Sequence, residues 1–167
     1  MTFELRPLSA DAIPAALEKA HRYRLLNEPL EAESICRDIL EIDSGNQDAL
    51  VTLLLALTDQ FDEHPSGAVE RAREVLARLA DDYVRTYHAG IIAERRAKAI
   101  IKRGGPRSRH SAYEWLRQAM DHYDKAAAIR PHGNDDAILR WNTCVRTLRR
   151  RPDLAPDLQE APPQWLE

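Results

Sequence analysis

The sequence AYEWLRQAMDHYDKAAAIRP, residues 112–131, has the spacing of a helix that packs between neighbouring helices. Ala119, Tyr123 and Ala126 are four and three residues apart, so they share one helical face, and Pro131 closes the helix. The two alanines let a neighbouring helix approach, and the tyrosine fills the space between layers. This pattern is typical of proteins built from stacked pairs of helices.

The composition agrees with an all-α protein of one domain. Of the 167 residues, 44% are hydrophobic, 31% are charged and only 6 are glycine. This balance favours helices joined by short turns. We expect residues 1–150 to form the helical domain. Residues 151–167 contain four prolines, at positions 152, 156, 162 and 163, and are expected to form an irregular tail that carries Trp165.

Several classes of protein are disfavoured by motifs that the sequence lacks. Cys36 and Cys144 are far apart and belong to no Cys or His cluster, so we expect no disulfide, no metal site and no cofactor. The first residues, MTFELRPLSAD, contain acidic side chains and no apolar run, which argues against a secretory signal. The longest apolar run, residues 49–57, is far shorter than a membrane span. We therefore expect a cytoplasmic protein that does not enter a membrane.

Apolar periodicity predicts seven helices along the chain. The first begins at Ser9 or Asp11 and ends before Asn27, and the others lie at about 30–42, 47–61, 66–79, 82–102, 111–131 and 135–150. Ser111 and Glu114 form an S-x-x-E pattern that predicts a capping box at the start of the sixth helix. The last helix is expected to pack through Ile138, Trp141, Val145 and Leu148.

Residues 13–46 resemble one tetratricopeptide repeat (TPR). The match consists of small residues, an aromatic residue and two apolar residues at the usual positions, namely Ala16, Ala20, Tyr23, Ala32, Ile39 and Leu40, followed by the ending ILEIDSGN. The chain departs from the family pattern at Lys19, Cys36 and Ser44. A looser resemblance extends over residues 11–150. It implies a right-handed α-α superhelix of about three TPR-like helix pairs, covered by a C-terminal capping helix.

The two halves of the chain carry opposite charge. Residues 1–80 have 15 Asp and Glu against 8 Lys and Arg, whereas residues 81–151 have 16 Lys and Arg against 8 Asp and Glu. Many of these cations fall in one basic patch, residues 95–110, which contains Arg95, Arg96, Lys98, Lys102, Arg103, Arg107, Arg109 and His110. Such a patch can bind acidic side chains, can neutralise phosphates, or can simply be a solvated surface.

The resemblance implies a non-enzymatic scaffold or adaptor that binds a protein or peptide in a groove. We expect the groove to be lined by the helices near 13–26, 47–61, 83–102 and 135–150. The candidate binding residues are four cations for an acidic ligand, together with one amide that can pair with a peptide backbone: Arg95, Lys98, Lys102, Arg140 and Asn142. The alternative is a regulatory module that binds nucleic acid through residues 95–110. A homodimer is also open, and Trp165 is expected either to pack on the domain or to dock elsewhere.

Overall fold

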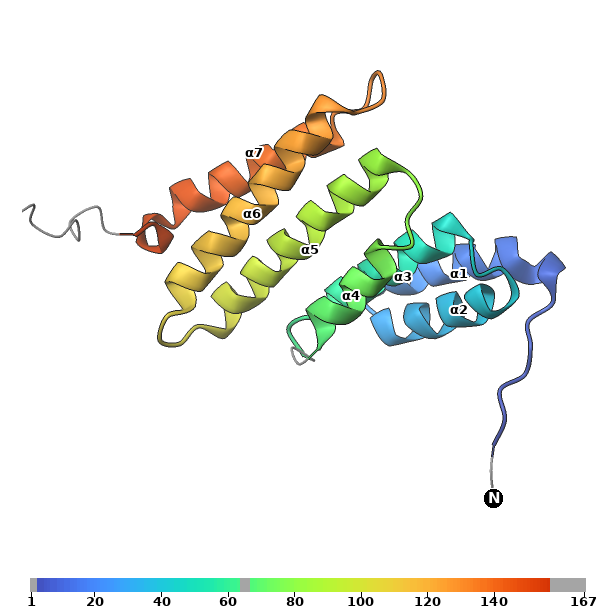
Figure 1. The fold of residues 1–167 in the computed structure, drawn as a ribbon. Helices are drawn as coiled ribbons and strands as arrows, with labels where there is room; N and C mark the ends of the chain where they lie inside the picture. The colour runs from blue at the N-terminus through green and yellow to red at the C-terminus, as the bar shows by residue number, and fades with distance from the viewer. Residues whose placement is uncertain (1–2, 64–66, 157–167) are drawn as a thin grey trace, which may run out of the picture.

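The computed structural model describes residues 3–63 and 67–156, and this part of the chain is all-α, with seven α-helices and no strand. Figure 1 shows their arrangement. The helices are α1 (Ile13–Leu25), α2 (Pro29–Ile42), α3 (Gln47–Asp59), α4 (Ala68–Leu76), α5 (Asp82–Arg103), α6 (Ser108–Ala128) and α7 (Asp136–Arg150). Two 3₁₀ turns, η1 (Ala10–Ala12) and η2 (Pro152–Leu154), flank them.

Each helix packs on the next one along the chain, and α3 also contacts both α1 and α5. Helices α1 to α4 form one half of the molecule and α5 to α7 form the other (Figure 1). The first half has its core around Leu50, Leu54, Leu57 and Phe61, and the second around Ile91, Leu116 and Tyr123. The side chains of Leu55 and Trp115 pack against both cores and so join the two halves.

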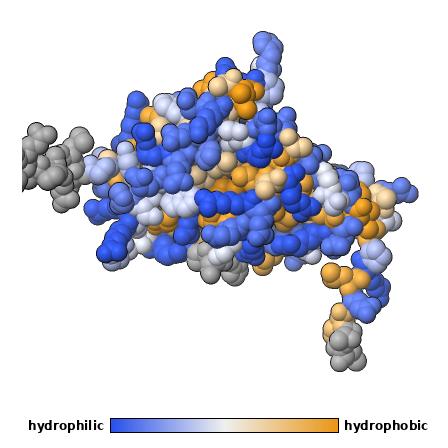
Figure 2. Space-filling view, viewed as in Figure 1, coloured by the Kyte–Doolittle hydropathy of each residue, from blue (hydrophilic) through white to orange (hydrophobic). Residues whose placement is uncertain are grey.

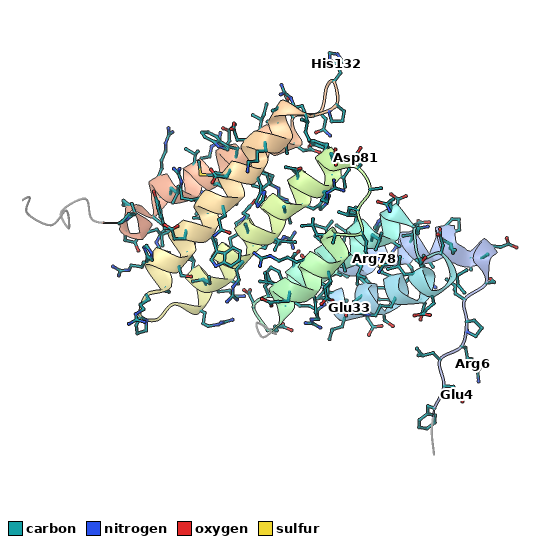
Figure 3. The ribbon with its side chains drawn as sticks, in the orientation of Figure 1. Glu4, Arg6, Glu33, Arg78, Asp81 and His132 are labelled. Atoms are coloured by element: carbon teal, nitrogen blue, oxygen red, sulfur yellow. The ribbon has the colours of Figure 1, made fainter. Side chains whose placement is uncertain are left out.

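Polar side chains fix the ends of several helices. Asn46 accepts a hydrogen bond from the backbone N–H of Ala49 at 2.9 Å, which caps α3, and Asp81 caps α5 by accepting from Val84 at 2.8 Å. Arg78 donates to the backbone oxygen of Ser44 at 2.7 Å. This contact ties the α4–α5 connection, where Arg78 and Asp81 lie (Figure 3), to the α2–α3 turn.

The predicted packing face of α6 is confirmed. Ala119, Tyr123 and Ala126 are all fully buried. Opposite Tyr123 on α5 stands Gly90, where an added Cβ would lie 2.5 Å from the tyrosine ring. The missing side chain at Gly90 therefore lets the Tyr123 ring lie directly against the backbone of α5.

The predicted start of α6 is wrong. The helix begins at Ser108, three residues before the expected capping box at Ser111 and Glu114. Gly104, Gly105 and Arg107 have positive φ angles and complete the turn, so the chain re-enters a helix sooner than the capping pattern indicates. The fourth helix is also shorter than expected, since α4 ends at Leu76 and the chain then turns.

The predicted packing face of α7 is confirmed at Leu148, which packs on the second core, and is wrong at Trp141. Ala137 and Cys144 are buried, whereas Trp141, which was expected to be packed, is 38% exposed. The inward face also carries Arg140, which forms an ion pair with the buried Glu94 of α5. A buried carboxylate needs a cationic partner, and this requirement rotates α7 away from the face with the largest apolar side chains.

After α7 the chain turns back onto the second core. Leu154 in η2 is buried there, and η2 contacts both α6 and α7. The expectation for Trp165 lies outside the described residues. Among the helices that the structure describes, none combines the length and the apolar character needed to cross a membrane.

Candidate binding site

A pocket of ≈ 330 Å³ opens where residues from the ends of α1 and α3 face α5 and α7. We call it the cationic pocket. It is lined by Asn27, Thr58, Asp59, Phe61, Asp62, Arg95, Lys98, Ala99, Lys102 and Arg140. The face of the molecule drawn in Figure 2 is mostly hydrophilic, with apolar side chains showing between the polar ones in the middle of the molecule.

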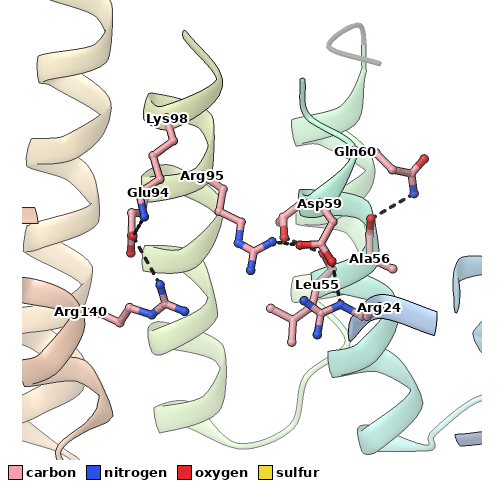
Figure 4. A network of polar contacts seen from close by, with 10 residues as sticks. Arg24, Leu55, Ala56, Asp59, Gln60, Glu94, Arg95, Lys98 and Arg140 are labelled. Atoms are coloured by element: carbon pink, nitrogen blue, oxygen red, sulfur yellow. Dashed lines mark hydrogen bonds and ion pairs between the residues drawn. The ribbon is translucent and has the colours of Figure 1, made fainter. Parts of the chain in front are cut away.

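On one side of the cationic pocket, the carboxylate of Glu94 on α5 holds the neighbouring cations in place. This carboxylate is only 1% exposed and accepts a hydrogen bond of 2.6 Å from the hydroxyl of Tyr123. It also forms ion pairs with Lys98 and with the Arg140 guanidinium, whose Nη1 lies 3.5 Å away (Figure 4). One buried anion thus joins α5, α6 and α7 and holds two cations at the edge of the pocket.

On the opposite side of the cationic pocket, the carboxylate of Asp59 holds two arginines in place. It accepts a hydrogen bond from Nε of Arg24 on α1 at 2.8 Å and forms an ion pair with Arg95 on α5 (Figure 4). Nearby, Lys102 donates to Asp62 at 2.6 Å. Burial, with repulsion from Arg24 and Arg140, lowers the pKa of Arg95 to about 10, so the guanidinium still carries its charge at neutral pH.

Positive charge exceeds negative charge around this pocket. Five cations surround it, against three carboxylates. The carboxylates are Asp59, Asp62 and Glu94, and the cations are Arg24, Arg95, Lys98, Lys102 and Arg140. The two lysines are also the most accessible of the five, with side chains 47% and 74% exposed. Their ammonium groups can therefore reorient toward an incoming anion, while the half-buried arginines stay in place.

Four of the five candidate residues from the sequence come together here. Arg95, Lys98, Lys102 and Arg140 line the cationic pocket, although they come from two helices that are distant in sequence. Asn142 does not join them, because it lines a different pocket between α6 and α7.

The sequence analysis did not predict the carboxylates that hold these cations in place. One signal was present for Glu94. It follows Tyr83, Tyr87 and Ile91 at helical spacing, so it falls on the expected packed face of its helix, where a carboxylate needs partners. Asp59 and Asp62 carry no comparable signal, since acidic residues at the end of a helix are common on solvated surfaces.

The basic patch at residues 95–110 does not form one continuous surface. Arg95, Lys98 and Lys102 face the cationic pocket, whereas Arg103 and Arg107 are exposed at the α5–α6 turn. The remaining members are also divided: Arg96 is half-buried, Arg109 lies 3.6 Å from Asp153, and His110 is exposed in the first turn of α6.

The two thiols are not arranged for chemistry. Cys36 and Cys144 are both buried, and burial raises the pKa of each to about 12, so both are protonated at neutral pH. Within residues 3–63 and 67–156, no three His, Cys, Asp or Glu side chains are placed to hold a metal ion together.

Comparison of the chain with protein-family models, with curated proteins and with solved structures finds no match.

Proposed function

We propose that this chain is a non-enzymatic scaffold of the TPR-like kind, a right-handed stack of helix pairs that binds an acidic segment of a protein partner. The packing of α3 on both α1 and α5 supports the proposal, because the first helices of successive pairs lie side by side in such a stack. On this view α1, α3, α5 and α7 line the binding surface, and α2, α4 and α6 form the outer layer.

One observation carries the proposed ligand class. Arg95, Lys98, Lys102 and Arg140 line a single pocket that is bordered by residues from all four of these first helices or their ends. Asp59 and Glu94 hold the two arginines in a fixed position before any ligand arrives. Carboxylates of the ligand would pair with the exposed ammonium groups of Lys98 and Lys102, and the ligand would displace Asp62 from Lys102.

The test must weaken the pocket without unfolding the protein. Removing Arg140 would take a partner from the buried Glu94, so the lysines are the better targets. The variant of the cationic pocket, called the groove variant, is Lys98→Gln/Lys102→Gln. In this variant Glu94 still has Tyr123 and Arg140 as partners. The matched control is Arg117→Gln/Lys125→Gln, which removes the same charge from two exposed positions on α6.

Tagged full-length wild type, groove variant and control are incubated with native lysate, and captured proteins are quantified by mass spectrometry. We expect a partner whose recovery falls about tenfold or more with the groove variant and is unchanged with the control, since tenfold corresponds to about 1.4 kcal/mol. An acidic peptide from that partner should compete for binding. Equal recovery from all three proteins would refute the proposed site.

The same samples distinguish the nucleic-acid alternative. Nucleic acid that is captured by the wild type and by the groove variant, and lost steeply as salt is added, would point to the exposed cations of the α5–α6 turn. The geometry favours the protein ligand, because Arg95, Lys98 and Lys102 already pair with carboxylates in the cationic pocket.

A further inference from the structure

A second pocket, of ≈ 290 Å³, lies between α6 and α7 and plays no part in the proposed function. It is lined by Tyr123, Asp124, Ala127, Ile138, Trp141 and Asn142, and we call it the α6–α7 groove. The pocket is mainly apolar, and Trp141 on its wall remains 38% exposed. Two further apolar side chains are exposed at the same end of the helix pair: Ile129, just after α6, is 52% exposed, and Leu139, in the first turn of α7, is 62% exposed.

This region is an apolar surface without a partner among the described residues. Figure 2 shows apolar side chains gathered near the place where α6 runs into the α6–α7 loop, whose tip carries His132 (Figure 3). Large apolar side chains that stay exposed close together indicate a surface that is covered by something else. Ile138 and Trp141, two of the four residues on the predicted packing face of α7, line this groove.

The chain that follows α7 is already directed onto this pair of helices. Leu154 in η2 inserts into the core between α6 and α7, and Asp153 lies 3.6 Å from Arg109 in the first turn of α6. The 3₁₀ turn η2 therefore lies at one end of the helix pair, and the α6–α7 groove lies toward the other end. From Arg109 to Tyr123 is roughly 21 Å along a helix at 1.5 Å per residue.

The length of the following segment is sufficient to reach the groove. An extended chain covers about 3.3 Å per residue, so the eleven residues from Leu154 to Trp165 span up to about 36 Å. Residues 157–167, DLQEAPPQWLE, supply three large apolar side chains, Leu158, Trp165 and Leu166. The adjacent prolines at 162 and 163 restrict the backbone, which lowers the entropy lost on docking.

The charges of the two elements are complementary. Residues 157–167 contain three acidic side chains and no basic one. Helix α7 has only Asp136 as an acidic residue and, besides Arg140, which pairs with Glu94 in the cationic pocket, carries three arginines, Arg146, Arg149 and Arg150. Attraction between them favours the chain's own segment over a second copy of α7, which would bring its arginines with it.

We propose that residues 157–167 dock along the α6–α7 groove and that Trp165 fills the pocket beside Trp141. Asn142 at the rim has an amide that can pair with the backbone of the docked segment. The docked segment covers the apolar face of α7 that the seven helices leave open. This inference is independent of the cationic pocket and of the ligand proposed there.

The test uses the full chain labelled with 5-fluorotryptophan, which gives one fluorine signal each for Trp115, Trp141 and Trp165. Single Trp→Phe substitutions assign the three signals. Solvent exposure of each ring is then read from the shift between water and heavy water, and a synthetic peptide of residues 157–167 supplies the fully exposed reference for Trp165.

We expect the isotope shift of Trp165 in the full chain to be at most about half that of the peptide. Replacing Trp165 by alanine should move the Trp141 signal and increase its exposure, whereas Leu5→Ala, at an exposed position in the N-terminal arm, should leave it unchanged. A Trp165 signal identical to that of the peptide would overturn the proposal. Protection of Trp141 that survives Trp165→Ala and rises with protein concentration would also overturn it and would assign the groove to a second copy.

Discussion

At the scale of single residues, the contact between Gly90 and Tyr123 controls how closely α5 and α6 approach. Tyr123 is fully buried and its hydroxyl donates to Glu94, so the ring cannot move away without breaking that hydrogen bond. A Cβ at position 90 would lie 2.5 and 2.7 Å from two ring carbons. The glycine is therefore a requirement of packing, even though it sits in the middle of a helix.

We predict that Gly90→Ala lowers the free energy of unfolding by about 1–2 kcal/mol, because overpacking outweighs the better helix propensity of alanine. Urea denaturation measures the change. Gly45→Ala is the control, since a Cβ there would meet only Asp43 Oδ1 at 3.9 Å, and its effect should stay within about 0.5 kcal/mol. A stabilised Gly90→Ala variant would contradict the close contact with Tyr123.

His88 makes the stability of the protein depend on pH. The ring is buried, its Nδ1 donates to the backbone oxygen of Val84 at 2.7 Å, and it lies edge-on to Tyr87. Burial, reinforced by the positive charges of Arg140 and Arg24, lowers the pKa of His88. Its stabilising effect is present above pH 6.5, where the unfolded state is also neutral, and is lost as the pH falls through the lower pKa of the folded state.

Between pH 7.5 and 5.0 we therefore expect the wild type to lose more stability than His88→Gln. The difference can reach about 1.4 kcal/mol for each pH unit between the two pKa values. Urea midpoints at both pH values measure it, and His132→Gln in the exposed α6–α7 loop serves as the control. The assignment fails if His88→Gln and the wild type lose stability equally.

At the scale of elements, Asp59 is the connection between helices that are not neighbours in sequence. It joins α1 through Arg24 and α5 through Arg95, and all three side chains are no more than about a quarter exposed. Removing its charge leaves two guanidinium groups close together without their anion.

We predict that Asp59→Asn lowers the free energy of unfolding by about 2 kcal/mol, because breaking a largely buried ion pair leaves uncompensated charge. Asp62→Asn is the matched control. Its partner Lys102 is exposed, so water replaces the lost contact and stability should change little. Thermal unfolding of the two variants compares them directly, and equal changes would show that Asp59 is no more than a surface charge.

At the scale of the whole molecule, the two halves meet where α5 packs on α3 and α4, and the buried Ile92 and Ala99 of α5 belong to the core of the first half. Leu55 and Trp115 pack against both cores, and the guanidinium of Arg73 lies 5.6 Å from the centre of the Trp115 ring. Because the cationic pocket takes Asp59 from one half and Arg140 from the other, its shape depends on how firmly the halves are joined.

We expect Trp115→Ala to weaken this coupling so that α1–α4 and α5–α7 no longer unfold together. Native-state hydrogen exchange at increasing urea should then give two sets of amide free energies where the wild type gives one. Trp141→Ala removes an indole that packs on only one half and should not separate the sets. Two sets already present in the wild type would contradict a single cooperative unit.

The apolar pattern of the chain is enough to predict the helices and most of their buried faces. Positions such as Ala119, Tyr123 and Ala126 are read correctly because residues three and four apart face the same way in any helix, whatever surrounds it. Helix ends were less certain. The α6 start depended on the backbone conformation of the turn before it, because the helix begins after Arg107, at a positive φ and without a side-chain cap.

Which charges meet depends on how the helices are arranged in three dimensions. Glu94 contacts Tyr123 and Arg140, which lie 29 and 46 residues away, and Asp59 contacts Arg24 at a separation of 35. No local pattern encodes such pairs, because they depend on how the helices cross. The same buried carboxylate turns Arg140 inward and leaves Trp141 at the surface. An ion buried in the core is costly without its partner. The pairing of Glu94 with Arg140 therefore determines the orientation of α7 more than the apolar stripe of α7 does.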